Sequence, residues 1–410
     1  MDVIRQQFQV AFHYPVYFTR DLFVSSNPVF RTAVQPTQPG RAARLLFVVD
    51  HGVAAAHPSL IEALTAYCRA HADALEMAAA PVVIPGGEHA KNDPAVVPQV
   101  IDAIHDAALC RHSYVVAVGG GAVLDVAGYA AGIVHRGVRL IRVPTTVLAQ
   151  DDSGMGVKNG VNLFGQKNYL GSFAPPFAVL NDFAFLTTLT DRDWRAGLAE
   201  AVKVALIRDP ALFDYLESHA GDLAGRDMAA MEHVIRRSAA LHLAHIAEGG
   251  DPFELGSSRP LDFGHWAAHK LEGLTRHRLR HGEAVAIGIA LDTTYSHLTG
   301  SLSEQEWRRI LDLLTALRLP IYHPQLSRRL DAVGDPSCVL AGLDEFREHL
   351  GGELTIMLLR GIGRPFDAHE IHRDIVRQSV ERLRTQGRST GEEEDAYDYP
   401  ISIERHGTGG

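Results

Sequence analysis

The sequence predicts an α/β fold, with a Rossmann-like, doubly wound N-terminal domain followed by a mainly α-helical C-terminal domain. Continuous apolar runs alternate with helical patterns in the first part of the chain, as expected for parallel strands buried on both faces. A glycine triplet at 119–121 stands between an apolar run and a helical pattern. From about Asp182 the pattern becomes helical. The predicted units are a Rossmann-like domain over 1–181, a helical domain over 182–385 and a disordered tail over 386–410.

The first predicted elements lie at the N-terminus. The segment 8–23 alternates apolar and polar residues around the sequence His-Tyr-Pro, which predicts a β-hairpin or two short strands. The apolar run 45–49 predicts a buried parallel strand that ends at Asp50. An aspartate at that edge either accepts hydrogen bonds from a cofactor ribose or caps the next helix, which the pattern predicts over 58–78.

The glycine turn is the centre of the predicted nucleotide-binding domain. A short strand at 82–84 and a helix at 94–109 lead to the central strand and its turn. Such a turn brings backbone N–H groups to a pyrophosphate, although a glycine triplet without the spaced GxGxxG pattern is also an ordinary tight turn. A further strand is predicted at 138–143. The segment 148–173 has no helical periodicity, which predicts a long functional loop.

Lysine is scarce in this chain. Only five of the 39 basic residues are lysines. Because arginine has replaced lysine almost everywhere, we expect lysine where a compact, titratable ammonium is needed. Lys91, Lys158 and Lys167 lie beside glycine turns, which favours a functional role over chance retention on the surface.

Composition excludes several classes of protein. A net charge of −10 without a basic segment argues against nucleic-acid binding. Three cysteines without a CxxC motif are typical of a reducing cytoplasm and exclude a cysteine-built metal site. The N-terminal sequence has no signal-peptide pattern, and no apolar run is long enough for a membrane span. We therefore expect a cytoplasmic protein with no nucleic-acid or membrane partner.

Histidines and an acid in the C-terminal half suggest a metal site. Glu200 and Lys203 lie on nearly one face of a predicted helix, and His265 and His269 share a face of another. His281 begins a third helix. One carboxylate and two imidazoles are a common catalytic zinc set, yet with 22 histidines a pair four residues apart is also expected by chance. Other candidates are His242, His245 and His277.

Seven motifs between Asp50 and Gly288 occur in a recognisable order. They are GGGAVLDVAGYAA, HRG, VPTTVLAQDDSGMGVKNGVN, KNYLGSF, GLAEAVK, GHWAAHKLE and HGEAVAIG. In order and spacing they resemble the dehydroquinate synthase superfamily, also called the sugar phosphate cyclases. The resemblance implies NAD in the N-terminal domain, zinc or cobalt in the C-terminal domain, an active site in the cleft between them, and a homodimer.

The resemblance also implies a role for each matching residue. The implied metal ligands are Glu200, His265 and His281. The implied cofactor contacts are Asp50, Glu88, Lys91, Gly120, Gly121, Asp125, Thr145, Thr146, Asp152, Lys158, Lys167 and Thr188. The implied catalytic, phosphate and substrate contacts are Arg136, Lys158, Asn168, Lys203 and His269.

Several positions depart from true dehydroquinate synthases, where they help to bind a substrate carboxylate. An arginine and an asparagine of that family read Ser258 and Asp262 here, and a lysine of the preceding helix reads His242. Arg259 could partly compensate. The segment FREHLGGELTIMLL is similar to sedoheptulose 7-phosphate cyclases, although that branch usually lacks the counterpart of His269. The chain therefore resembles a divergent member of the sedoheptulose 7-phosphate cyclase-like branch.

The implied reaction turns a heptulose-type sugar phosphate into a carbocyclic ketone. Its steps are transient oxidation by NAD, phosphate elimination, reduction, ring opening and intramolecular aldol closure. The alternatives are 3-dehydroquinate synthase itself, a metal-dependent polyol or glycerol dehydrogenase, and a non-enzymatic metal- or nucleotide-binding protein. The predicted set of phosphate-binding cations argues against a dehydrogenase.

Overall fold

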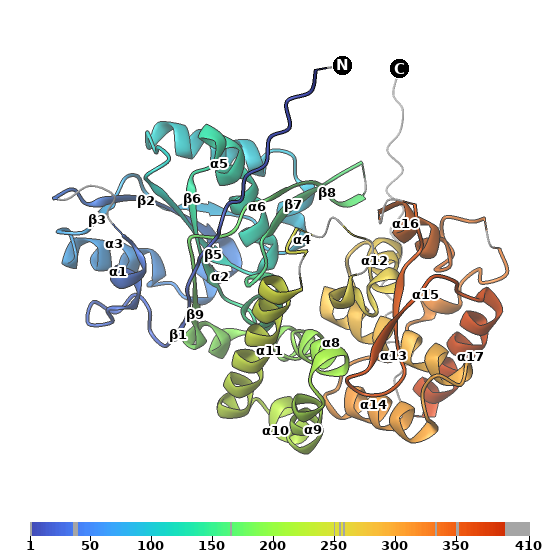
Figure 1. The fold of residues 1–410 in the computed structure, drawn as a ribbon. Helices are drawn as coiled ribbons and strands as arrows, with labels where there is room; N and C mark the ends of the chain where they lie inside the picture. The colour runs from blue at the N-terminus through green and yellow to red at the C-terminus, as the bar shows by residue number, and fades with distance from the viewer. Residues whose placement is uncertain are drawn as a thin grey trace, which may run out of the picture.

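The structure is a computed structural model that describes residues 2–35, 40–164, 166–249, 251–253, 256, 259–332, 334–349 and 352–389. It consists of a sheet half, blue to green in Figure 1, and a helical half, light green to red. The sheet half contains strands β1 (Val16–Thr19), β2 (Ala43–Asp50), β3 (Leu75–Met77), β4 (Val82–Ile84), β5 (Tyr114–Gly119), β6 (Arg139–Pro144) and β9 (Ala178–Asp182). Its helices are α1 (Val29–Ala33), α2 (His51–Ala56), α3 (Leu60–Ala70), α4 (Glu88–Asn92), α5 (Val96–Asp106) and α6 (Gly121–Ile133).

The seven strands form one parallel sheet in the order β1-β9-β6-β5-β2-β3, with β4 pairing the C-terminal end of β2. Alternate residues of β2 face opposite cores. Phe47 packs in the cluster that contains α3, whereas Val48 packs in the cluster that contains α5 and α6. Because helices cover both faces, the strands are continuous apolar runs, and the doubly wound fold is confirmed.

Two predictions for the N-terminal part are wrong. No hairpin forms within 8–23: residues 2–15 have neither helix nor strand, and β1 instead pairs in parallel with the distant β9. The helix predicted over 58–78 ends at Ala70, and residues 75–77 form the edge strand β3. In both places pairing with a distant strand at the sheet edge decides the structure, and the local alternation of apolar and polar residues does not indicate that partner.

The segment 148–173 is not an irregular loop, and that prediction is also wrong. A single turn of π-helix, Ala149–Ser153, is followed by the antiparallel strands β7 (Lys158–Leu163) and β8 (Gln166–Phe173). Most residues of β8 are exposed, so the strand carries no apolar signal in the sequence. The hairpin projects from the sheet half toward the helical half (Figure 1).

The helical half is built around α13 (His281–Leu298), of which residues 282–296 are all buried. The other helices are α7 (Asp191–Ala196), α8 (Leu198–Arg208), α9 (Pro210–Ser218), α10 (Ala220–Ala224), α11 (Met228–Glu248), α12 (His265–Leu274), α14 (Glu304–Ala316), α15 (Pro324–Ser327), α16 (Ala341–His349) and α17 (Arg373–Ser389), with a small hairpin of β10 (Ile356–Leu359) and β11 (Pro365–Ala368). Helix α17 includes the first residues of the predicted tail, and 390–410 lie outside the described residues.

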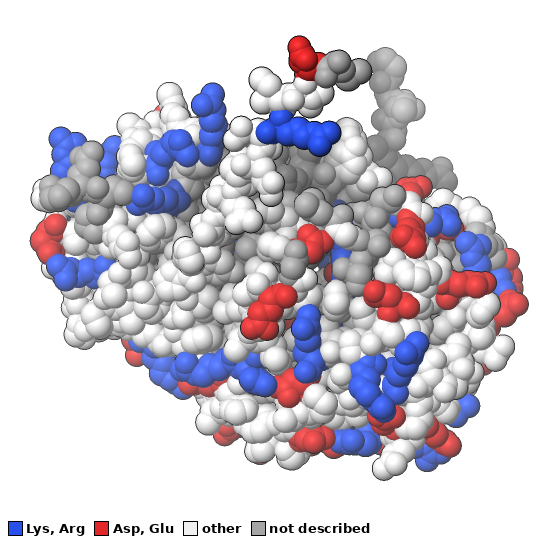
Figure 2. Space-filling model, in the orientation of Figure 1, with Lys and Arg blue, Asp and Glu red and all other residues white. Residues whose placement is uncertain are grey.

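The surface mixes charges of both signs. On the face in Figure 2, acidic and basic side chains are interspersed over the helical half. Among the helices that the structure describes, none is long and apolar enough to cross a membrane.

Candidate active site

A cavity of about 1240 Å³ lies between the sheet half and the helical half. Its walls are the C-terminal ends of the parallel strands, the β7–β8 hairpin and the N-terminal ends of α12 and α13. Ligands of doubly wound folds bind outside the carboxyl ends of the strands. The cavity therefore lies where a doubly wound fold is expected to have its active site.

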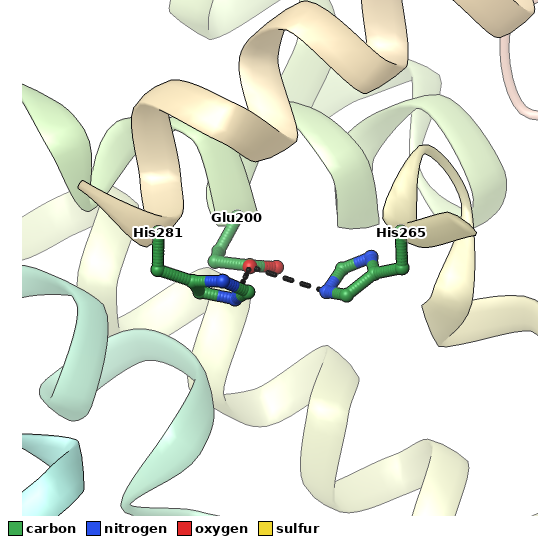
Figure 3. A group of neighbouring side chains, drawn as sticks. All are labelled: Glu200, His265 and His281. Atoms are coloured by element: carbon green, nitrogen blue, oxygen red, sulfur yellow. Dashed lines mark ion pairs between the residues drawn. The ribbon is translucent and has the colours of Figure 1, made fainter. Parts of the chain in front are cut away.

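Glu200, His265 and His281 come together at the helical wall of the cavity (Figure 3). They belong to the first turns of α8, α12 and α13. The Nε2 atoms of His281 and His265 lie 3.4 and 3.7 Å from Oε1 of Glu200, and one ligand atom from each residue lies within 4.8 Å of the others. The carboxylate points between the two imidazoles, an arrangement with the donor set of a catalytic zinc site.

The side chains of Glu200, His265 and His281 do not satisfy one another by hydrogen bonds, and their ligand atoms suit a divalent cation. Glu200 is 1% exposed, and its Oε1 has no hydrogen bond of acceptable geometry to any described residue. Burial disfavours the charge of Glu200, but the ammonium of Lys203, 2.5 Å from Oε2, lowers its pKa to about 2. An ionised, buried and incompletely satisfied carboxylate beside two imidazoles is what a zinc or cobalt ion needs.

Close backbone packing sets the positions of these helices. A Cβ atom at Gly282 would lie 1.8 Å from the carbonyl oxygen of Ala196, so only glycine lets α13 begin against the end of α7. The side chain of Glu283 accepts from the backbone N–H of Arg280 at 2.8 Å and caps the same end. His281 is thereby fixed between two constrained residues.

Glu272 of α12, which is not among the residues predicted from the sequence, contacts His281 on the side away from Glu200. Its Oε2 lies 3.0 Å from Nδ1 of His281, and Lys167 of β8 donates to both carboxylate oxygens. A carboxylate on the second nitrogen of a metal-ligating histidine fixes the tautomer and the ring orientation. The spacing of Glu272 from His265 places it on the same helical face, a signal that could have found it.

A second network joins the sheet half to the helical half. Asp152 Oδ1 lies 2.9 Å from Nδ1 of His242 and 3.5 Å from Nζ of Lys203. Burial would raise the pKa of Asp152, but Lys203 and His242 lower it far below its usual range. An anion held between two donors stays ionised, so the charges at this end of the cavity are fixed.

The residues predicted to contact the cofactor line the cavity at the ends of the strands. Gly120 and Gly121 form the turn between β5 and α6, as expected for a pyrophosphate cradle. Lys91 is 2.6 Å from Asp125 and also donates to Asn168. Asp50 accepts from the N–H of Gly52 at 2.7 Å and so caps α2, a short helix that precedes the one predicted to follow this strand. The others that line the cavity are Glu88, Thr145, Thr146, Asp152, Lys158, Lys167 and Thr188.

Among the predicted substrate contacts, Lys158, Asn168, Lys203 and His269 line the cavity. Burial first, and then Lys167, lowers the pKa of His269 well below its usual value, so this imidazole is neutral. Arg136 is not among the described residues that line the cavity and is exposed on the turn after α6. Of the predicted specificity residues, His242, Arg259 and Asp262 line the cavity, and Ser258 lies outside the described residues.

Comparison with known proteins places these features in a family context. Residues 81–196 match the family model of the 3-dehydroquinate synthase N-terminal domain, and residues 197–333 match that of the C-terminal domain. A 3-dehydroquinate synthase of Rhodopseudomonas palustris (strain BisB18) is 34% identical over 90% of this chain and 93% of its own. A 2-epi-5-epi-valiolone synthase of Streptomyces glaucescens is 36% identical over 69% of this chain and 71% of its own.

A solved structure is also similar over most of the chain. It is a 2-epi-5-epi-valiolone synthase from Streptomyces hygroscopicus subsp. jinggangensis 5008 with NAD⁺ and Zn²⁺ bound. The TM-score is 0.82 at 32% sequence identity, and the match covers 93% of this chain and all of the other.

Proposed function

Because the chain belongs to the 3-dehydroquinate synthase family of sugar phosphate cyclases, we propose that it converts a neutral heptulose phosphate into a carbocyclic ketone. The best candidate substrate is sedoheptulose 7-phosphate or a close relative. The observation that carries the proposal is one cavity lined by the glycine turn at 120–121, the carboxylate–imidazole cluster of Glu200, and lysine side chains. The implied homodimer and cytoplasmic location stay predictions.

The proposed cofactors are NAD at the glycine turn and a zinc or cobalt ion at Glu200, His265 and His281. The related valiolone synthase structure holds NAD⁺ and Zn²⁺, and the donor set here fits such an ion. When bound, NAD would accept and return a hydride, and the metal would polarise the oxygen from which that hydride leaves.

The side chains of this protein would bind the phosphate and move protons. Lys158 and Asn168 of the β7–β8 hairpin face the cavity together with Lys203 of α8, and such groups bind phosphate oxygens. His269 is neutral and lies beside His281, with the ring centroids 6.1 Å apart. A neutral imidazole can accept a proton, so we assign His269 to proton transfer.

The proposed substrate class follows from the departures at the specificity positions. Asp262 presents a carboxylate to the cavity where a dehydroquinate synthase presents an amide. His242 is held by Asp152 and stands where that family has a lysine. A substrate carboxylate would meet an anion and lack cations, whereas the hydroxyls of a neutral heptulose can donate to Asp262.

Of the two alternative enzymes, specific observations favour 3-dehydroquinate synthase and not a dehydrogenase. Identity to 3-dehydroquinate synthases is as high as identity to valiolone synthases, and Arg259 lines the cavity as a replacement clamp for a carboxylate. Structural likeness to dehydrogenases is confined to the fold, because those structures are no more than 15% identical. The cations around the cavity favour a phosphate-bearing substrate over a simple polyol.

Phosphate release from a panel of sugar phosphates tests the proposed substrate. We expect kcat/KM for sedoheptulose 7-phosphate, or a close neutral relative, to exceed that for a heptulosonate phosphate at least about a hundredfold, the size expected from roughly 3 kcal/mol. Comparable efficiency on the heptulosonate would contradict the proposal and favour dehydroquinate synthase.

A further inference from the structure

Asp292 is a buried carboxylate that the proposed reaction does not use. It lies on α13, the helix that begins with His281, and is 2% exposed. Its Oδ1 accepts from Nε1 of Trp266 at 2.8 Å, and its Oδ2 accepts from the backbone N–H of Gly264 at 3.1 Å. These two donors belong to the residues on either side of His265.

A single peptide unit connects Asp292 to His265. The N–H of the peptide between Phe263 and Gly264 donates to Asp292, and its carbonyl lies 3.1 Å from Nδ1 of His265. When Nδ1–H donates to that carbonyl, Nε2 is free to face Glu200, as the 3.7 Å contact shows. A carboxylate at the N–H end of a peptide polarises it, which makes the carbonyl at the other end a stronger acceptor.

Backbone packing leaves this peptide little freedom. Gly264 has a φ of 79°, and a Cβ there would lie 2.8 Å from the backbone nitrogen of Ile289. A Cβ at Gly288 would lie 1.9 Å from the carbonyl oxygen of Gly264. The start of α12 is therefore pressed against α13, with Asp292 as its hydrogen-bonding contact.

We propose that Asp292 is a positioning residue for the metal centre, which fixes the tautomer and direction of His265 through the peptide between Phe263 and Gly264. Glu272 does the same for His281 by direct contact, so each histidine ligand has its own carboxylate. Outer partners of metal ligands commonly contribute 10- to 100-fold to metal affinity. The inference rests on the proposed metal site.

Metal binding by Asp292→Asn measures the effect without reference to turnover. The readouts are the Kd for Zn²⁺ by competition with a chromophoric chelator, the visible spectrum of the Co²⁺-substituted protein, and circular dichroism for the fold. We expect a folded variant that binds Zn²⁺ about 10- to 100-fold more weakly and has an altered Co²⁺ spectrum. Glu272→Gln is the comparison, and Asp312→Asn, an exposed carboxylate on α14, is the matched control.

Wild-type affinity together with a wild-type Co²⁺ spectrum in folded Asp292→Asn would overturn the inference. If Asp292→Asn does not fold, Trp266→Phe is tested instead. This variant removes one of the two hydrogen-bond donors to Asp292 and leaves its carboxylate less constrained. For this variant we expect a smaller loss of Zn²⁺ affinity, about 2- to 10-fold, together with a changed Co²⁺ spectrum. An unchanged Co²⁺ spectrum would overturn the inference.

Glu200→Ala separates this inference from the proposed function. Equal Zn²⁺ binding by the wild type and Glu200→Ala would reject the metal site itself. Loss of binding in Glu200→Ala alone, with Asp292→Asn unaffected, would reject only the role of Asp292.

Discussion

Lys167 of strand β8 lies 2.7 and 2.8 Å from the two carboxylate oxygens of Glu272 on helix α12. The pair joins the β7–β8 hairpin of the sheet half to the helical half across the cavity. The Glu272 side chain is only 4% exposed. Burial disfavours its charge, but Lys167 and then His281 hold the pKa of Glu272 well below its usual value.

Lys167→Met should destabilise the protein by about 3 kcal/mol, because it leaves a buried carboxylate without its cation. The double variant Lys167→Met/Glu272→Gln should recover part of that loss, since both charges are gone. Urea denaturation measures both. The control is Lys270→Met, whose partner Glu345 is 57% exposed and which should cost below about 1 kcal/mol. Equal losses for the two lysine variants would contradict the prediction.

Gly120→Val should abolish bound NAD while the protein stays folded. A Cβ at Gly120 already lies 3.3 Å from Cγ2 of Thr146, so a larger side chain must occupy the space proposed for the pyrophosphate. Extraction and chromatography of the purified protein measure NAD content. Gly221→Ala serves as the control, because no atom lies within 4 Å of its added Cβ. Full NAD content in Gly120→Val would show that the cofactor does not bind at this turn.

Asp262→Asn should raise kcat/KM for a heptulosonate phosphate by about tenfold, the equivalent of about 1.4 kcal/mol, because it removes an anion from the carboxylate's path. The same change should lower kcat/KM for the neutral heptulose phosphate, which loses a charged acceptor. Steady-state kinetics on both substrates measures the ratio, with Asp312→Asn as the control. No change in the ratio would remove Asp262 from the specificity site.

His323 should contribute to acid sensitivity. Burial lowers its pKa to about 4, with Glu283 opposing, and its Nδ1 accepts from the N–H of Gln325 at 3.1 Å. Because the unfolded histidine titrates near pH 6.5, the unfolded state binds the proton more tightly. The stabilising contribution is complete above about pH 6.5 and is lost as the pH falls toward 4, by roughly 3 kcal/mol.

His323→Asn keeps a helix-capping side chain without a titrating group. Its unfolding free energy should fall less steeply between pH 6.5 and 4 than that of the wild type. Denaturation curves across this pH range decide the matter. The exposed His105→Asn should leave the slope unchanged, and a wild-type slope in His323→Asn would contradict the prediction.

Much of the fold and of the site could be predicted because the relevant signals are local. The run ending at Asp50 is a strand, and the glycine triplet lies between β5 and α6, because burial on both faces leaves a continuous apolar pattern. Glu200, His265 and His281 could be proposed from their residue types and family motifs. The structure brings them together, while their action as ligands stays a prediction.

What could not be predicted depends on contacts between distant segments. Strand β1 forms only because β9 supplies an edge, and the β7–β8 hairpin has too few buried side chains to give a period. Glu272 and Asp292 gain their significance from His281 and from the peptide before Gly264. The spacing of Glu272 from His265 indicates the face of α12 on which it lies, but no pattern within α12 indicates that its partner is His281 of α13.

Simultaneous measurement of inorganic phosphate and of absorbance at the NADH wavelength, with sedoheptulose 7-phosphate as substrate, tests the central claim most directly. A cyclase returns its hydride in every turnover. The account therefore predicts release of one phosphate per sugar consumed, with no net NADH. Accumulation of NADH without phosphate release would contradict the account and identify a dehydrogenase.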